Sequence, residues 1–391
     1  MSAAPVRASA LVVGAGVAGA AVAWHLVQRG WRDVHVVDER GRPGEGTTGR
    51  ATGGYRAQYA SAINVRLSLL TRAKLATFAE ETGGDAGYRP CGYLWLATDP
   101  DDLAELEAGR QVQLAAGLTE AVALTPDEAR RLNPAIDDDA IVGATYCPTD
   151  GFVRPLGLLG GYLDAATRAG ARVHWGERVQ EVTRGADRLV LGVETTTLRF
   201  APEQVVLCGG CWSGPLAGRF GHWLPVRPLR RQVAATVPQA ALPEAMPMTI
   251  WAGDGFHLRV RDGRVLLLRP TPGDPLDEWA DQVEPAWLDA IRASMDARLP
   301  ALRAVPIDPA ASWAGLYEMT PDRHAIVGRL PGAPNVFVQT GSSGHGVMHA
   351  PALGQLLAEL MTDGRYVTLD ATVLRAERFA AGESLPGSGL L

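Results

Sequence analysis

The spacing of apolar and polar residues predicts a βαβ unit at the start of the chain. Residues 10–13 are a short β-branched run, and a glycine-rich turn follows directly. Residues 20–29 have the composition of a helix that ends at Gly30, and residues 34–37 form a second apolar run that closes at Asp38. A strand, a glycine turn, a helix and a strand in this order are typical of α/β folds.

The rest of the chain changes from α/β to β-rich patterns and back. Helical patterns lie at 65–81, 101–116, 156–169 and 348–361, and Thr125 and Glu128 predict a capping box that opens another helix. Runs of strand type lie at 93–97, 172–175, 179–182, 205–207 and 336–338, and residues 41–60 have the composition of a loop. Residues 223–320 hold further β-like stretches, such as 255–260 and 265–268, which favour an antiparallel sheet. This order predicts one α/β domain, assembled from separated segments, with a second domain inserted.

Composition and charge exclude several classes of protein. The chain has 391 residues, of which 47% are hydrophobic and 20% charged, as in a soluble globular protein of two or three domains. A net charge of −6 argues against a nucleic-acid partner. With four cysteines and no secretory signal at the start, we expect a cytoplasmic protein. The apolar run 8–27 is long enough to suggest a membrane span, but glycines and His25 interrupt it, so we expect none.

The first turn carries the pattern G-x-G-x-x-G. Gly14 allows a tight turn, Gly16 allows a pyrophosphate to approach the backbone, and Gly19 allows the helix to pack closely on the strand. Asp38 follows at the end of the second strand, where a carboxylate accepts hydrogen bonds from an adenosine ribose. This context favours dinucleotide binding over an apolar helix with chance glycines, and leaves a nicotinamide and a flavin dinucleotide both open.

Two cysteines, Cys208 and Cys211, have the spacing of a redox dithiol or half of a zinc site. A zinc site needs a second ligand pair, and the other cysteines, Cys91 and Cys147, lie far apart in the sequence. The segment 205–213 also has the pattern of a strand that runs into a turn of small residues against a cofactor. We favour this cofactor turn and expect no metal.

Residues 341–350 are rich in glycine and histidine. His345 and His349 are four residues apart, which suits a metal pair on a helix, but the glutamate of HExxH is missing. The segment also lacks the G-x-S-x-G pattern of a nucleophile elbow. A glycine turn that opens the helix at 348–361 fits better, and the positive end of that helix would face an electron-rich ring.

Taken together, these motifs resemble the D-amino-acid oxidase superfamily of FAD enzymes. The closest branch is that of sarcosine oxidase and dehydrogenase beta-type subunits and dye-linked proline dehydrogenases. The resemblance covers nearly the whole chain, and its landmarks are the glycine motif at 14–19 and the segments 47–56, 147–151, 315–322 and 343–346. It implies a discontinuous Rossmann-type FAD-binding domain at 1–87, 148–216 and 318–391. An inserted substrate or cap domain, with an antiparallel β-sheet and helices, would take up 88–147 and 217–317.

The resemblance also implies a non-covalent FAD site. The first glycine loop would hold the pyrophosphate, Asp38 the ribose, and the loop 47–54 the ribityl chain and ring, while Val179 would contact adenine through its backbone. The turn 344–346 and its helix would cover the pyrimidine side of the flavin. The implied FAD-binding residues are Gly14, Gly16, Val17, Ala18, Gly19, Asp38, Glu39, Arg40, Thr47, Thr48, Arg50, Ala51, Thr52, Gly53, Gly54, Val179, Cys208, Gly209, Gly210, Trp212, Gly315, Ser343, Gly344, His345, Gly346, Val347 and Met348.

The implied catalytic residues are Arg56, Tyr317 and His345. Arg56 matches the arginine that holds a substrate carboxylate in sarcosine oxidases, and a guanidinium fork pairs with a carboxylate through two hydrogen bonds. A surface arginine and a core tyrosine are the alternatives for Arg56 and Tyr317. The reaction implied is hydride transfer from a C–H bond of a small, secondary amino acid such as sarcosine or proline to flavin N5, which leaves an imine.

Three positions depart from the family pattern. Gly315 stands where monomeric sarcosine oxidase tethers FAD through a cysteine, so covalent attachment there is excluded. Met348 replaces a lysine that binds the substrate carboxylate. The lysine that promotes reaction with oxygen has no counterpart, since the single lysine, Lys74, lies on an early helix; Arg269 is the nearest candidate. The missing lysine favours a dehydrogenase with another electron acceptor over a fast oxidase using O2.

Several other functions stay open at this point. They are a D-amino-acid or glycine oxidase of the same superfamily, a non-catalytic flavoprotein subunit of a larger complex, and an ordinary NAD dehydrogenase. The late landmarks at 315–322 and 341–349 argue against the NAD enzyme, because a nicotinamide domain does not need them. The beta-type resemblance allows a partner subunit or a homo-oligomer.

Overall fold

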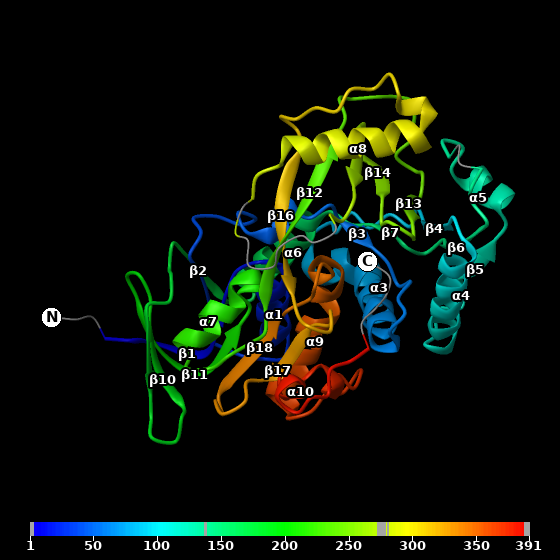
Figure 1. Cartoon of the computed structure of the whole chain (residues 1–391). Coiled ribbons are helices and arrows are strands. Elements are labelled where there is room, and N and C mark those ends of the chain that lie inside the picture. The colour runs from blue at the N-terminus through cyan, green and yellow to red at the C-terminus, as the bar shows by residue number, and fades with distance from the viewer. Residues whose placement is uncertain (1–3, 137–138, 272–278, 280, 387–391) are drawn as a thin grey trace.

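Two sheets organise the chain, and helices cover them (Figure 1). The computed structural model describes residues 4–136, 139–271, 279 and 281–386. The first sheet contains β1 (Val6–Val13), β2 (Val34–Asp38), β8 (Arg172–Trp175), β9 (Glu181–Arg184), β10 (Val190–Glu194), β11 (Arg199–Leu207), β17 (Ile326–Arg329) and β18 (Val336–Thr340). The second contains β4 (Tyr93–Ala97), β5 (Val122–Leu124), β6 (Gly143–Cys147), β12 (Arg227–Ala235), β13 (Met248–Trp251), β14 (His257–Arg261), β15 (Arg264–Leu268) and β16 (Trp313–Met319).

The first sheet is parallel through its centre. Its order is β17-β18-β11-β1-β2-β8, and all neighbours are parallel except the edge pair β17 and β18. Every residue of β1 from Ala10 to Val13 is buried, as expected for a central parallel strand with both faces covered. The ribbon β9–β10 extends from β11 by antiparallel pairing.

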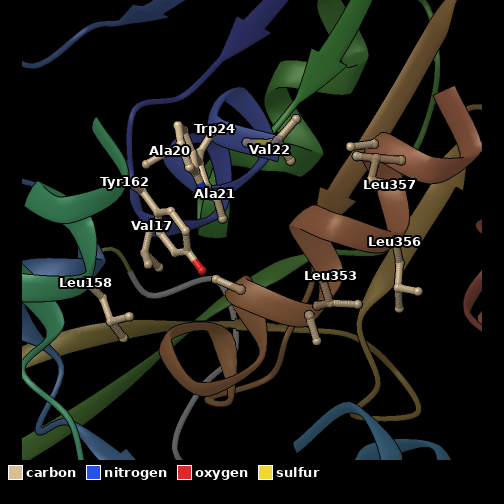
Figure 2. Packing of buried hydrophobic residues seen from close by; sticks show 14 of the residues in the cluster. Val17, Ala20, Ala21, Val22, Trp24, Leu158, Tyr162, Leu353, Leu356 and Leu357 are labelled. Atoms are coloured by element: carbon tan, nitrogen blue, oxygen red, sulfur yellow. The ribbon is translucent and has the colours of Figure 1, made fainter. Parts of the chain in front are cut away.

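Four helices pack together beside this sheet, and the first and last of them contact its strands. They are α1 (Val17–Gln28), α3 (Ala62–Thr82), α6 (Pro155–Arg168) and α9 (Gly346–Asp363). Figure 2 shows Ala20, Ala21 and Trp24 of α1 beside Tyr162 of α6, with the leucines of α9 on the other side. The first and last thirds of the chain therefore share one core. At Gly354 an added Cβ would lie only 2.8 Å from the Cβ of Ala21, so the close crossing of α9 and α1 requires a glycine.

The second sheet is antiparallel apart from one pair. Its order is β16-β12-β15-β14-β13-β4-β6-β5, in which only β13 and β4 run parallel. Helix α8 (Pro285–Arg298) packs Trp287, Ile291 and Met295 into the core of this sheet. Helices α4 (Pro100–Ala115) and α5 (Pro126–Leu132) lie at its other end (Figure 1). The remaining elements are α2 (Thr47–Arg50), β3 (Gly54–Tyr55), β7 (Gly151–Phe152), η1 (Gly210–Trp212), α7 (Ser213–Arg219), η2 (Pro300–Leu302), η3 (Thr372–Leu374) and α10 (Glu377–Ala380).

The predicted α/β class, with a Rossmann-type sheet and a second, mostly antiparallel sheet, is confirmed. The capping box at Thr125 is also present. The strands predicted within 223–320 are present, and three local details differ from the predictions. The strand expected at 179–182 begins only at Glu181, the loop at 41–60 contains α2 and β3, and the β-like region 223–320 also contains α8. Strand β16 runs past 317, the predicted limit of the inserted domain, and the domain limits stay predictions.

The apolar run 8–27 is divided between β1 and α1 by the glycine turn. Within the described parts of the chain, none of the helices combines the length and the apolar character needed to cross a bilayer.

Candidate functional site

A cavity of about 1010 Å³ lies between the two sheets. The carboxyl ends of β1, β2, β8 and β11 form one wall, and residues of β12 to β16 form the opposite wall. In open α/β sheets, the crevice outside the carboxyl ends of the strands is the usual place for a ligand.

The first glycine turn, residues 14–16, belongs to the wall formed by the first sheet. Gly14 has a φ of +108°, and a Cβ there would lie 2.3 Å from the carbonyl oxygen of Cys208. A Cβ at Gly19 would lie 1.8 Å from the carbonyl oxygen of Gly14, so Gly19 packs α1 onto the turn and does not line the cavity. The N-terminus of α1 therefore opens directly onto the cavity, as phosphate binding requires.

Asp38, which is predicted to hold a ribose, ends β2 and lines the cavity. Its Oδ2 accepts a hydrogen bond from the backbone N–H of Ala15 at 2.7 Å, and its Oδ1 accepts one from Arg40 at 2.8 Å. Burial raises the pKa of this carboxyl above its ordinary value. Each oxygen keeps a further lone pair, so Asp38 can hold the turn and still accept a ligand hydroxyl.

The segment 47–54 joins the two walls. Thr48 Oγ1 accepts a hydrogen bond from the N–H of Val17 at 3.2 Å, which ties α2 to the start of α1. Arg50 reaches the second sheet, donating to the carbonyl oxygen of Ala314 at 2.8 Å and pairing with Asp281 at 2.7 Å. In return the indole of Trp313 donates to the carbonyl oxygen of Arg50 at 2.8 Å.

The pair Cys208 and Cys211 lies in the turn after β11. All four cysteines of the chain are described, and none is in a disulfide. Burial raises the pKa of both thiols, and the nearby Glu318 carboxylate raises it further. A redox dithiol needs a lowered pKa, so this environment supports the cofactor turn instead. Among the described residues, no group of three or more His, Cys, Asp and Glu side chains could hold a metal ion.

The second glycine turn connects β18 to α9. Ser343 has a φ of +49°, a conformation that costs energy for a residue with a side chain. Its N–H donates to the carbonyl oxygen of Glu318 at 3.0 Å, and its Oγ accepts from the N–H of Thr320 at 3.1 Å. Strand β16 therefore holds this turn, and the positive end of α9 faces the cavity through Gly346 and Val347.

The two histidines of this region have different surroundings. His349 is buried, bonds Ser68 Oγ through Nε2 at 2.9 Å, and has a pKa lowered to about 3 by burial. His345 lines the cavity, and its ring stands edge-on to Tyr59 with the centroids 4.8 Å apart. They are a core histidine and a cavity histidine.

Arg56 is a buried charged group in the lining of the cavity. It is only 4% exposed and stacks over the rings of Tyr59, 4.2 Å from its guanidinium carbon to the centroid, and Trp95, at 5.2 Å. One Nη donates to the carbonyl oxygen of Gln58 at 2.8 Å, and the other lies 3.4 Å from Nε2 of His345. The predicted alternative of a surface arginine is wrong.

Asp150 supports the segment that carries Arg56. It is fully buried and accepts hydrogen bonds from the N–H groups of Ala57 at 2.7 Å and Gln58 at 3.3 Å. Burial raises its pKa to about 7. The landmark at 147–151 therefore acts on the site by fixing the backbone beside Arg56.

Tyr317 lines the cavity from β16 and is half-buried, so the predicted alternative of a core tyrosine is wrong. A Cβ at Gly344 would lie 2.5 Å from its ring, so ring and turn are in close contact. On the other side, the guanidinium carbon of Arg231 lies 5.8 Å from the ring centroid. His257 also faces this region, and burial together with Arg56 and Arg231 lowers its pKa to about 4.

Every predicted site residue except Gly19 lines the cavity. Arg269 does so too and pairs with Asp254 at 3.3 Å, whereas Lys74 lies on α3 beside Glu81 and is not part of the lining. Many of the lining residues that sequence reasoning missed lie on strands of the second sheet. The main ones are Leu229, Arg231, Val233, Met248, Ile250, His257, Leu268 and Glu318.

These surroundings fit FAD. The Gly14 turn leaves no room for a Cβ, the N-terminus of α1 and Asp38 offer partners for a pyrophosphate and a ribose, and a second glycine turn with the N-terminus of α9 lies farther along the same cavity. The cavity is therefore lined in two places by glycine-rich backbone that a long, anionic dinucleotide can approach.

The comparisons with known proteins agree. Residues 9–360 match the DAO family, described as FAD dependent oxidoreductase. The glycine oxidase of Geobacillus kaustophilus is 30% identical over 374 residues, which cover 91% of this chain and 93% of the relative. The 4-methylaminobutanoate oxidase (formaldehyde-forming) of Paenarthrobacter nicotinovorans is 26% identical over 97% of this chain, which spans only 46% of that protein.

Among solved structures, the L-proline dehydrogenase from P. horikoshii superimposes with a TM-score of 0.89 at 25% identity. The match covers 98% of this chain and 100% of that one. The NAD dehydrogenase considered from the sequence is wrong, because the family match and the second glycine turn both point to a flavin enzyme. The chain belongs to the DAO family of FAD-dependent oxidoreductases.

Proposed function

We propose that this enzyme oxidises a small amino acid with a secondary amine, of the sarcosine or proline type, to the imine. The observation that carries the proposal is the buried Arg56 guanidinium, which lines the cavity next to the turn that opens α9. The three relatives described above are named for glycine, 4-methylaminobutanoate and L-proline, which all combine an amine with a carboxylate. A cation in an apolar, aromatic setting is the group such substrates require.

The protein's part in the reaction is to bind and orient the substrate. Arg56 is held by Gln58, Tyr59 and Trp95, so its guanidinium is already oriented when a carboxylate arrives. An arginine only donates hydrogen bonds, so Nε2 of His345 can take part in their contact only as the acceptor. No side chain has to act as a base if the amine binds in its neutral form.

Tyr317 and the second glycine turn form the opposite boundary of the reacting region. The ring of Tyr317 lies so close to Gly344 that a Cβ there would be 2.5 Å from it, so ring and turn leave no gap between them. FAD, when bound, supplies the ring that accepts the hydride released by the substrate carbon. The positive end of α9 then favours the added negative charge.

The test compares each substrate with its carboxylate-free counterpart, under anaerobic conditions, by loss of oxidised-flavin absorbance. Proline is paired with pyrrolidine, and sarcosine with dimethylamine. Arg56→Gln should lower the second-order rate constant for flavin reduction by proline and sarcosine roughly 30- to 1,000-fold, corresponding to ~2–4 kcal/mol. The same rate constant for pyrrolidine and dimethylamine should change little. Arg66→Gln, an exposed arginine on α3, is the matched control. An equal loss on both compound classes would contradict the clamp.

The same assay separates the alternatives. The 30% identity to a glycine oxidase favours a second candidate, an oxidase of primary or D-amino acids, and glycine and D-alanine therefore belong in the panel. A flavoprotein that dithionite reduces but that no amine reduces would support the non-catalytic subunit. Lys74 lies outside the cavity lining, which supports an electron acceptor other than O2. A partner subunit or homo-oligomer and a cytoplasmic location stay predictions.

A further inference from the structure

One carboxylate in the cavity wall has no part in the proposed reaction. Glu318 lies on β16 between Tyr317 and Met319 and is half-buried, with its open side toward the cavity. Its Oε2 accepts hydrogen bonds from the N–H of Gly341 and from Thr340 Oγ1, both at 3.0 Å. Ser342 adds hydrogen bonds from its backbone and side chain. The carboxylate therefore holds the start of the turn that opens α9.

Two glycines leave this carboxylate open to the cavity. A Cβ at Gly346 would lie 3.2 Å from Oε1, and a Cβ at Gly210 would lie 4.0 Å from Oε2. Both glycines line the cavity and belong to the two turns that the FAD site uses. Because neither has a side chain, no group from these positions separates the carboxylate from a ligand.

The charge of Glu318 affects groups to which no hydrogen bond connects it in the part of the chain that the structure describes. Its carboxylate raises the pKa of the Cys208 and Cys211 thiols. Its Oε1 lies beside Gly346, the first residue of α9, where the helix dipole stabilises an anion. Burial alone would favour the neutral acid, and raises the pKa of Glu318, but the N–H and hydroxyl donors favour the carboxylate.

We propose that the Glu318 carboxylate positions the FAD-facing turn and makes bound FAD harder to reduce. Reduction adds negative charge to the flavin, and a fixed anion in the cavity wall disfavours that charge. The positive end of α9 favours that charge, so the reduction potential of bound FAD depends on both the carboxylate and the helix. A lower potential makes it easier for the reduced enzyme to pass its electrons on. This proposal rests on FAD binding by the family and not on the proposed amino-acid substrate.

The experiment measures the midpoint potential of the holoenzyme by anaerobic dithionite titration with a reference dye. Glu318→Gln keeps the size of the side chain and removes the charge. We expect the equilibrium constant for two-electron reduction to rise about tenfold or more, which is about 30 mV. Thr340→Val, which removes one donor and leaves the charge, is the control and should stay within about threefold of wild type. A Glu318→Gln potential equal to or below that of wild type would overturn the proposal.

A second variant keeps the test decisive if Glu318→Gln does not retain FAD. Glu318→Asp preserves the charge, so it should retain FAD and keep a potential below that of any neutral variant that binds the cofactor. Retention of FAD by Glu318→Asp but not by Glu318→Gln supports the positioning role of the carboxylate. Retention of FAD by Glu318→Gln but not by Glu318→Asp would show that the side-chain length, and not the charge, positions the turn, and would overturn that role. No amine substrate enters these measurements, so their result is independent of the proposed reaction.

Discussion

Gly14→Ala tests the glycine turn most directly, and Gly30→Ala is its matched control. The two glycines flank α1, and both have a positive φ, +108° at Gly14 and +87° at Gly30. They differ in their surroundings. An added Cβ at Gly14 would meet the backbone of Cys208, with the carbonyl oxygen at 2.3 Å and the carbonyl carbon at 2.8 Å, whereas a Cβ at Gly30 would have no atom within 4 Å.

The expected magnitudes follow from this difference. A side chain at positive φ costs about 1–2 kcal/mol at either position, and the stiffer unfolded chain returns about 0.4–1 kcal/mol at both. Gly30→Ala should therefore lower the free energy of unfolding by about 0–1.6 kcal/mol. Gly14→Ala adds a clash that separates β1 from β11, and overpacking of this kind costs a further ~1–3 kcal/mol. The difference between the free energies of unfolding of the two variants therefore measures the clash, because the backbone contribution is common to both.

Two assays read this difference. Urea unfolding of the FAD-free proteins should place the midpoint of Gly14→Ala clearly below that of Gly30→Ala. Titration with FAD, followed by flavin fluorescence, should show affinity at least about tenfold weaker for Gly14→Ala only, since we expect that turn to bind the pyrophosphate. Equal unfolding midpoints would refute the clash, and equal FAD affinity would refute the placement of the cofactor at this turn.

Three further predictions concern the cofactor link and two buried charges. Because Gly315 offers no side chain, acid precipitation should leave the flavin in the supernatant, and yellow colour in the pellet would contradict a non-covalent cofactor. Burial raises the pKa of Asp150 from 3.8 to about 7, so the folded protein binds that proton more tightly than the unfolded chain. The free energy of unfolding should therefore fall as the pH rises from 4 to 7, by up to ~4 kcal/mol more in wild type than in Asp150→Asn. Urea midpoints that change with pH in parallel for the two proteins would exclude this contribution of Asp150. Arg378→Met should destabilise by ~3–5 kcal/mol because it leaves the Asp322 carboxylate, which it bonds at 2.8 and 3.0 Å, buried without its partner. Adding Asp322→Asn should restore part of the urea midpoint, and no recovery would show that the loss comes from packing.

The cofactor side of the cavity could be predicted because backbone geometry limits the sequence there. Gly14 has a positive φ and no room for a Cβ, and Gly344 has a φ of +93° against the ring of Tyr317. Almost only glycine fits at such positions, so the glycines in the sequence indicate the backbone geometry. The same is true of the capping box at Thr125, where two side chains satisfy two backbone groups.

Helix α8 shows a signal that was present but overlooked. Trp287, Ile291 and Met295 are each four residues apart and all face the core of the second sheet. That spacing is typical of one face of a helix. The neighbouring β-like stretches and prolines favoured a prediction of strands for the region 223–320. The helical spacing of these three residues was overlooked.

The substrate side could not be predicted, because a strand decides by alternation which residues face the cavity. On β12, Leu229, Arg231 and Val233 line the cavity together with part of Gln232, whereas Arg230 is absent from the lining and pairs with Glu284 at 2.6 Å. The sequence shows only two adjacent arginines, and a shift of one residue in register would exchange their roles. The pairing of Arg231 with Gly315 on β16 fixes the register, and it comes from residues more than eighty positions apart. Arg231, rather than Arg230, is therefore the position where a change of charge should alter which substrates enter without disturbing the packing of α8.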